Sequence, residues 1–157
     1  MKMINWILKR KLLIIGALSL IITANAQNST YINNHKSIST ELSEQYGIPS
    51  SLILAVALVE SSSGNGKAAR KLNNHFGIVG KNSMREKGYR SRYKQYKNDN
   101  ESFLDFCRLV SNKKFYSRLK DNNNPGEWVK ALSHAGYSTQ PELWEKKILN
   151  TISVNRL

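Results

Sequence analysis

The segment at residues 52–60, LILAVALVE, constrains the fold more than any other stretch of the sequence. It is apolar up to its final glutamate, so a helix formed here has no polar face and must lie inside the core. Pro49 suits the first turn of a helix, and the serines and the glycine that follow Glu60 favour its end. The sequence therefore predicts a central buried helix at about residues 50–62, with a single carboxylate where the chain leaves the core.

Helical patterns also dominate the rest of the chain. Ile38, Leu42 and Tyr46 form one stripe of a predicted helix at residues 37–46, and Gly47 marks its end. Residues 80–96 lack helical spacing, and their tyrosines alternate with basic residues, which predicts a small β-hairpin or irregular lobe. Further helices are predicted at residues 67–72, from Asn98, around residues 115–119, from Asn124 and from Thr139. The expected fold class is α+β, mainly α, with a helical lobe and this small lobe in one domain.

The N-terminus has the pattern of an export signal. Four basic residues precede an apolar run at residues 12–22, and Ala24-Asn25-Ala26 supplies the small residues that signal peptidase requires. A retained membrane anchor is the alternative, but the run is shorter than the roughly 20 residues of a spanning helix. We therefore predict a signal peptide at residues 1–26, a flexible lead-in at 27–36 and the domain at 37–157. The mature protein is expected in the periplasm or cell envelope, without stable insertion into the membrane.

The charge and the cysteine content exclude several kinds of partner. The formal charge of +13 falls to about +9 without the signal peptide, and a basic exported protein is attracted to anionic wall polymers or lipid headgroups. The sequence contains no block of basic residues interleaved with aromatic residues, so a nucleic-acid surface is not expected. Cys107 is the only cysteine and lies in an apolar helical pattern, which predicts a buried thiol. The three histidines lack the spacing of metal ligands, so neither a metal nor another cofactor is expected.

Glu60 is the carboxylate that the sequence singles out for chemistry. Burial disfavours the charged form of a carboxylate and raises its pKa, and the negative end of a helix dipole acts in the same direction. Because Glu60 directly follows the apolar run, we expect it to be partly buried. An acid that stays protonated near neutral pH can donate its proton to the leaving oxygen of a glycosidic bond. The alternative is a glutamate that merely meets solvent as its helix leaves the core.

Several motifs around and after this glutamate resemble, in order and spacing, those of a known family. The first group is Leu58-Val59-Glu60-Ser61, Gly64-Asn65-Gly66-Lys67 and Asn73-Asn74-His75-Phe76-Gly77-Ile78. The later group is Tyr93-Lys94-Gln95-Tyr96 with Glu101-Ser102-Phe103, and Gly136-Tyr137-Ser138-Thr139 through Pro141. Together they resemble glycoside hydrolase family 73, the exported glucosaminidases of the lysozyme superfamily, over about residues 37–152. The expected two-lobed α+β layout is then lysozyme-like.

The resemblance implies an endo-acting glucosaminidase. Its substrate is the peptidoglycan glycan strand, cleaved at the β-1,4 bond between N-acetylglucosamine and N-acetylmuramic acid by a monomer without a metal. Glu60 matches the general acid, and Tyr137 matches a tyrosine beside the cleavage point. Asn74, Phe76 and Gly77 are expected to shape the floor of the cleft. Phe76 can equally be core, and Tyr137 can be a packing residue at a helix start.

The second catalytic carboxylate is less clear from the sequence. The two-acid mechanisms need it roughly 5–9.5 Å from the first. Glu86 is the only glutamate between residues 80 and 96, so it is the predicted partner. Asp99, Glu101 and Asp105 follow, but helix capping and solvated helix faces explain them equally well. The N-acetyl group of the substrate is the alternative to a second acid.

Tyr93 is the predicted aromatic contact to substrate. Together with Tyr89 and Tyr96 it could stack against sugar rings, although alternating tyrosines are also what one buried face of a small sheet contains.

Two other functions fit the same residues. A lytic transglycosylase also depends on one glutamate but closes muramic acid into a 1,6-anhydro ring. A catalytically inactive wall-binding module would use the same cleft without cleaving a bond.

Overall fold

The computed structural model describes residues 26–84 and 86–157. The predicted signal peptide lies outside the described residues, apart from Ala26, and stays a prediction. In the described part, no helix is both long enough and apolar enough to cross a membrane.

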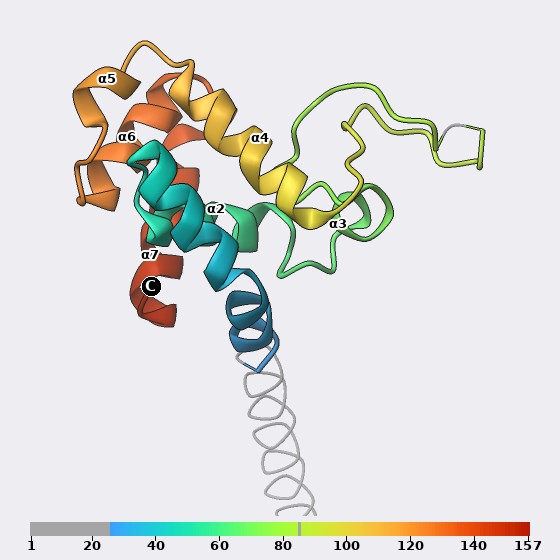
Figure 1. Cartoon of the computed structure of the whole chain (residues 1–157), viewed down its shortest axis with the longest axis horizontal. Coiled ribbons are helices and arrows are strands. Elements are labelled where there is room, and N and C mark those ends of the chain that lie inside the picture. Colours follow the sequence, from blue (N-terminus) through green and yellow to red (C-terminus); the bar gives the residue numbers. More distant parts are fainter. Residues whose placement is uncertain (1–25, 85) are drawn as a thin grey trace, which may run out of the picture.

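The described chain is mainly helical, with one small irregular lobe (Figure 1). An N-terminal helix covers residues 26–46 and ends at Gly47, whose φ of 61° suits a helix end. The other helices are α2 (Ser50–Glu60), α3 (Lys67–Leu72), α4 (Asp99–Ser111), α5 (Tyr116–Leu119), α6 (Pro125–His134) and α7 (Pro141–Asn155). The expected α+β fold, mainly α, is confirmed by this arrangement.

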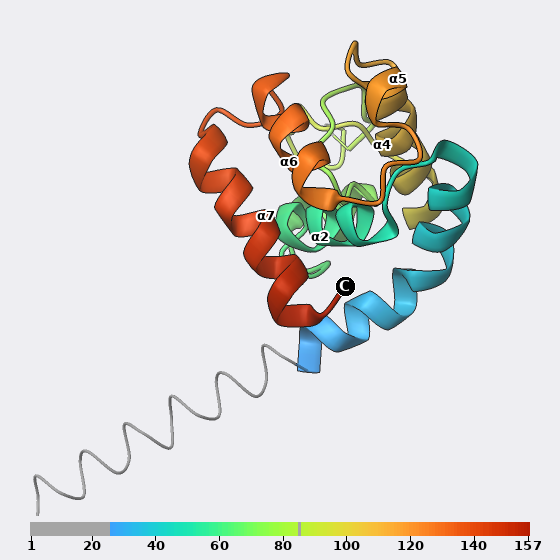
Figure 2. The same ribbon diagram turned by 90° about the vertical axis from the view of Figure 1, so that its left-hand side faces the viewer.

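Helix α2 is the centre of the core, as its apolar sequence predicts. Every residue from Leu52 to Leu58 is buried, and the helix contacts α4, α6 and α7. In Figure 2, α2 lies between α7 and the N-terminal helix. The helix ends at Glu60, because Ser62 and Ser63 adopt left-handed backbone angles with φ of 51° and 53°. It is therefore two residues shorter than the sequence pattern predicts.

The flexible lead-in predicted at residues 27–36 is wrong, because these residues belong to the N-terminal helix. Tyr31, His35, Ser39 and Leu42 recur at helical spacing, and all four are buried. The ring of His35 stacks on Phe103 of α4, with centroids 5.0 Å apart. The apolar pattern missed this helix because tyrosine, histidine and serine supply most of its buried face.

The small lobe at residues 78–96 extends away from the helices (Figure 1). Its two arms meet at one antiparallel bridge, between Val79 and Tyr93. The Lys94 side chain and the Tyr96 hydroxyl each bind Asp105 of α4 at 2.7 Å, which fastens the lobe to the helical body. The predicted β-hairpin or irregular lobe is confirmed.

Candidate active site

Glu60 lies in a cleft between the helical body and the small lobe. The cleft has a volume of about 530 Å³. We call it the Glu60 cleft; it is lined by Glu60, Phe76, Gly77, Ile78, Val79, Arg92, Tyr93, Leu109, Lys113, Gly136, Tyr137, Ser138 and Thr139. Glu60 is the only carboxylate among these lining residues.

Among the described residues, one hydrogen bond fixes the Glu60 carboxylate. The indole N–H of Trp144, a buried residue of α7, donates to Glu60 Oε1 at 2.8 Å. A methyl group added to Gly77 would lie 4.0 Å from Oε2, so the backbone at Gly77 passes close beside the second oxygen. The carboxylate is therefore held on one side, while the other oxygen faces the turn that lines the cleft.

The prediction that Glu60 is partly buried is wrong, because its side chain is exposed. Burial along α2 stops at Leu58, and Val59 is already partly open to solvent. The helix leaves the core in its last turn, so the apolar run does not enclose the residue that follows it.

The turn at residues 73–77 brings two predicted residues to the cleft. Phe76 is buried and stacks on Phe106 with centroids 4.3 Å apart, so it belongs to the core and also lines the cleft. Gly77 has φ of 66°, which a residue with a Cβ adopts only with strain. Phe76 thus anchors the turn in the core, and Gly77 allows the backbone of the turn to lie close to Glu60.

Asn74 is buried and does not line the cleft. Its side-chain amide donates to the carbonyl oxygens of Ile78 and Lys94, at 2.9 and 2.8 Å, and its oxygen accepts from the Ile78 N–H. These bonds hold the turn to the small lobe. Asn74 therefore shapes the cleft by positioning the turn, and a direct contact with substrate stays a prediction.

Tyr137 lines the cleft from the loop between α6 and α7. Its hydroxyl donates to the Phe76 carbonyl oxygen at 3.2 Å, and its ring lies 5.2 Å from that of Trp144. Burial, together with the nearby charge of Glu60, raises the pKa of Tyr137 well above its ordinary value. Tyr137 is therefore an uncharged phenol that connects the Phe76 turn to the helix carrying Trp144.

Tyr93 also lines the cleft, where its partly buried ring has the Arg92 guanidinium 5.7 Å from its centroid. Arg92 and Lys113 line the cleft as well and make it basic. Tyr89 lies elsewhere, with the Lys71 ammonium 5.2 Å from its ring centroid, so the three tyrosines do not form one surface.

The structure does not bring Glu86 into the cleft. Glu86 is exposed on the small lobe and is absent from the lining residues. The other candidates are engaged elsewhere: Asp99 with two histidines, Asp105 with Lys94 and Tyr96. Glu101 caps α4 by accepting from the backbone N–H of Lys97. A catalytic role for Glu86 stays a prediction without geometric support.

Two features of the structure were not predicted from the sequence. No sequence motif singles out Trp144, although a buried indole N–H needs an acceptor and therefore points to a polar neighbour. His35, His75 and Asp99 place their ligand atoms within 4.8 Å of one another, although they lie far apart in the sequence. The absence of metal-like spacing therefore did not exclude a group of potential ligands.

Comparison with known proteins identifies the family. Residues 36–157 match the family model described as glucosaminidase, mannosyl-glycoprotein endo-beta-N-acetylglucosaminidase. A curated relative, exo-glucosaminidase LytG of Bacillus subtilis (strain 168), is 30% identical over 67% of this chain. The match spans 44% of the length of LytG.

Solved structures of similar fold confirm the expected lysozyme-like architecture. The catalytic domain of the autolysin Auto from Listeria monocytogenes has a TM-score of 0.69 and 20% identity, covering 83% of this chain and 85% of that domain. The glycoside hydrolase domain of FlgJ from Salmonella typhimurium, in a C-terminally truncated form, has a TM-score of 0.65 and 22% identity, covering 82% and 97%. The chain therefore belongs to the glucosaminidase family of glycoside hydrolases, as its motifs predicted.

Proposed function

We propose that this protein cleaves the β-1,4 bond between N-acetylglucosamine and N-acetylmuramic acid in peptidoglycan, with Glu60 as the general acid. The observation that carries the proposal is the position of Glu60 in a cleft of a glucosaminidase domain, as its only lining carboxylate. The curated relative is named an exo-glucosaminidase, and proteins of similar fold include a peptidoglycan hydrolase from Sphingomonas sp. A1.

The hydrogen bond from Trp144 supports a defined direction of proton transfer. It occupies Oε1, which leaves Oε2 on the Gly77 side to carry the proton. In the reaction, Glu60 gives this proton to the glycosidic oxygen while the bond from that oxygen to C1 of N-acetylglucosamine breaks. The leaving oxygen becomes the free hydroxyl of muramic acid, and a water molecule supplies the new C1 hydroxyl.

The absence of a second carboxylate among the cleft residues favours substrate assistance. Cleavage after N-acetylglucosamine leaves the 2-acetamido group on the sugar whose C1 reacts. Its carbonyl oxygen can attack C1 as the bond to the leaving oxygen breaks, which forms a cyclic intermediate that water then opens. Glu60, as the carboxylate, takes the proton from that water. The predicted role of Glu86 is the alternative, and it requires the small lobe to carry Glu86 to the cleft.

The charge of the cleft fits an anionic glycan strand. Arg92 and Lys113 line it, and peptidoglycan carries carboxylates on its muramic acid and stem peptides. With the predicted signal peptide, the proposal includes action as an exported monomer in the periplasm or cell envelope. We propose endo cleavage along the strand, although the curated relative is named for exo action.

The chemistry of the new reducing ends tests this function. Purified peptidoglycan is digested, reduced with borohydride and hydrolysed to its sugars. We expect glucosaminitol from wild-type digests and none from E60Q digests. Muramicitol, or anhydromuramic acid ends typical of a lytic transglycosylase, would contradict the proposal. Binding of glycan strands without any new ends would identify the inactive wall-binding module instead.

A further inference from the structure

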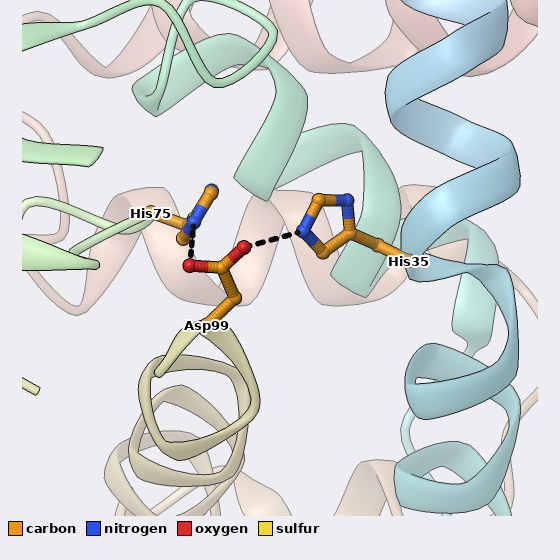
Figure 3. A group of neighbouring side chains, drawn as sticks. All are labelled: His35, His75 and Asp99. Atoms are coloured by element: carbon orange, nitrogen blue, oxygen red, sulfur yellow. Dashed lines mark hydrogen bonds and ion pairs between the residues drawn. The ribbon is translucent and has the colours of Figure 1, made fainter. Parts of the chain in front are cut away.

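A second carboxylate, Asp99, lies between two imidazole rings from distant parts of the chain (Figure 3). His35 comes from the N-terminal helix, His75 from the turn at residues 73–77, and Asp99 from the first turn of α4. The Nε2 atoms of His35 and His75 lie 3.3 and 3.0 Å from the two Asp99 oxygens. We call these three residues the histidine cluster; Glu60 is not part of it, and the function proposed above does not use it.

The Nδ1 atoms of both histidines are occupied by one residue, Tyr31. His35 Nδ1 lies 2.8 Å from the Tyr31 carbonyl oxygen, which can only accept, so Nδ1 carries a proton. His75 Nδ1 lies 2.7 Å from the Tyr31 hydroxyl, which can accept from it. In the neutral tautomers with Nδ1 protonated, both Nε2 lone pairs then point toward Asp99. Histidines that bind metals have this arrangement, with Nδ1–H fixed by an oxygen and Nε2 free.

These tautomers favour a cation between the three groups. Two imidazole lone pairs and a carboxylate facing one another repel unless a positive charge lies between them. The His75 Nε2 atom is buried and lacks a well-directed hydrogen bond, despite its short distance to Asp99.

We propose that His35, His75 and Asp99 form a zinc site. Two imidazoles and one carboxylate are a ligand set that suits Zn²⁺, whereas Mg²⁺ and Ca²⁺ prefer oxygen ligands. Ligand bonds of roughly 2.0–2.2 Å place neighbouring ligands of a tetrahedral zinc about 3.4 Å apart. The observed separations to Asp99 are 3.3 and 3.0 Å, and all three ligand atoms lie within 4.8 Å of one another. Small side-chain rotations therefore suffice to bring them onto one ion.

The fourth zinc ligand is water or another small ligand from the adjacent pocket. This pocket, of about 500 Å³, is lined by all three cluster residues and by Tyr31, which lets the ion enter from solvent. The zinc joins the N-terminal helix to α4 and to the turn that continues into Phe76 and Gly77. It thereby stabilises one wall of the Glu60 cleft without contacting substrate.

Zinc binding is tested on the full protein without a polyhistidine tag, after dialysis against EDTA. Titration calorimetry with zinc sulfate is expected to show saturable binding at one site. The midpoint temperature of thermal unfolding should rise by roughly 5–10 °C when free zinc is at about 100 times its Kd. EDTA should reverse this rise. Magnesium sulfate should produce neither effect.

Variants separate the cluster from other histidines and acids. D99N and H35Q should each bind zinc at least about tenfold more weakly than the wild type. Both variants should also lose the stabilisation by zinc. H134Q removes an exposed histidine outside the cluster, and E60Q removes the cleft acid, so both should bind like the wild type. The proposal is overturned if the wild type shows no saturable binding, or if D99N binds zinc as tightly as H134Q. Stabilisation by acid alone, with no response to zinc, would show that protons occupy the cluster instead.

Discussion

Glu60 and Asp99 are carboxylates at opposite ends of helices, and their surroundings differ in almost every respect. Glu60 ends α2, where the helix dipole disfavours negative charge, and it receives one hydrogen bond, from Trp144. Asp99 begins α4, where the dipole favours negative charge, and both of its oxygens face imidazoles. The comparison shows how position sets the surroundings of a carboxylate: Glu60 faces the cleft, where we propose that it transfers a proton, whereas Asp99 contacts two histidines from distant parts of the chain.

The largest expected effect is on the cleavage rate, and it should differ between variants of Glu60 and Asp99. E60Q should lose about 10²- to 10⁴-fold in the rate of glycan cleavage, because it removes the proposed proton donor. D99N should lose less than about tenfold in rate but should unfold at a lower temperature than E60Q. Reducing-end release and thermal unfolding, measured on both variants, check this. Equal losses of activity would mean that the two acids do not differ in role.

Trp144 tests how much the single hydrogen bond to Glu60 matters. W144F keeps an aromatic ring but removes the N–H, so we expect about a tenfold lower kcat with little change in KM. W128F is the matched control, because Trp128 is also buried and donates its N–H to a carbonyl, that of Asn122. W128F should lose stability but keep kcat. A similar fall in kcat for both variants would assign Trp144 to packing alone.

Gly77 tests the close passage of the turn beside Glu60. In G77A the left-handed backbone angle should cost about 1–2 kcal/mol of folding free energy, and the new methyl group near Oε2 should lower activity several-fold. Gly88 has a similar φ of 77°, but nothing lies within 4 Å of an added methyl group. G88A should therefore lose comparable stability in chemical denaturation and keep its activity. Full activity in G77A would show that substrate does not need this space.

The smallest expected effect is on folding stability, when the contact between the small lobe and Asp105 is removed. This effect depends on pH. Burial opposes ionisation of Asp105, but the hydrogen bonds from Lys94 and Tyr96 outweigh it, so the pKa of Asp105 is lowered. Its contribution to stability is then complete above the unfolded pKa of about 4 and is lost as the pH falls further. D105N should unfold more easily than the wild type at pH 7, by less than about 1 kcal/mol, and the difference should shrink toward pH 2. Urea unfolding at several pH values measures it, and a difference that grows in acid would contradict the assignment.

The sequence predicts the elements better than it predicts the contacts between them. Helix α2 follows from its apolar run, and α4 and α6 begin at the predicted caps, where Asn98 accepts from Glu101 N–H and Asn124 from Gly126 N–H. These signals are local, so one sequence contains them. Cys107 is also buried, as its apolar surroundings predict.

The contacts that define the two acids are not local. Trp144 lies 84 residues from Glu60 and Asp99 lies 64 residues from His35, so no spacing rule connects them. The exposure of Glu60 was likewise missed, because an apolar run shows where burial begins but not the residue at which the helix leaves the core. The helix at residues 27–36 was missed because its buried face is largely polar.

A structure of the E60Q variant with a bound peptidoglycan glycan fragment tests the central claim most directly. The slow variant keeps the fragment intact, and the position of the scissile bond can then be read. The side chain at position 60 should lie within hydrogen-bonding distance, about 3 Å, of the glycosidic oxygen that follows N-acetylglucosamine. A glycan bound in the cleft with that oxygen out of reach of position 60 would contradict the assignment of Glu60 as the proton donor.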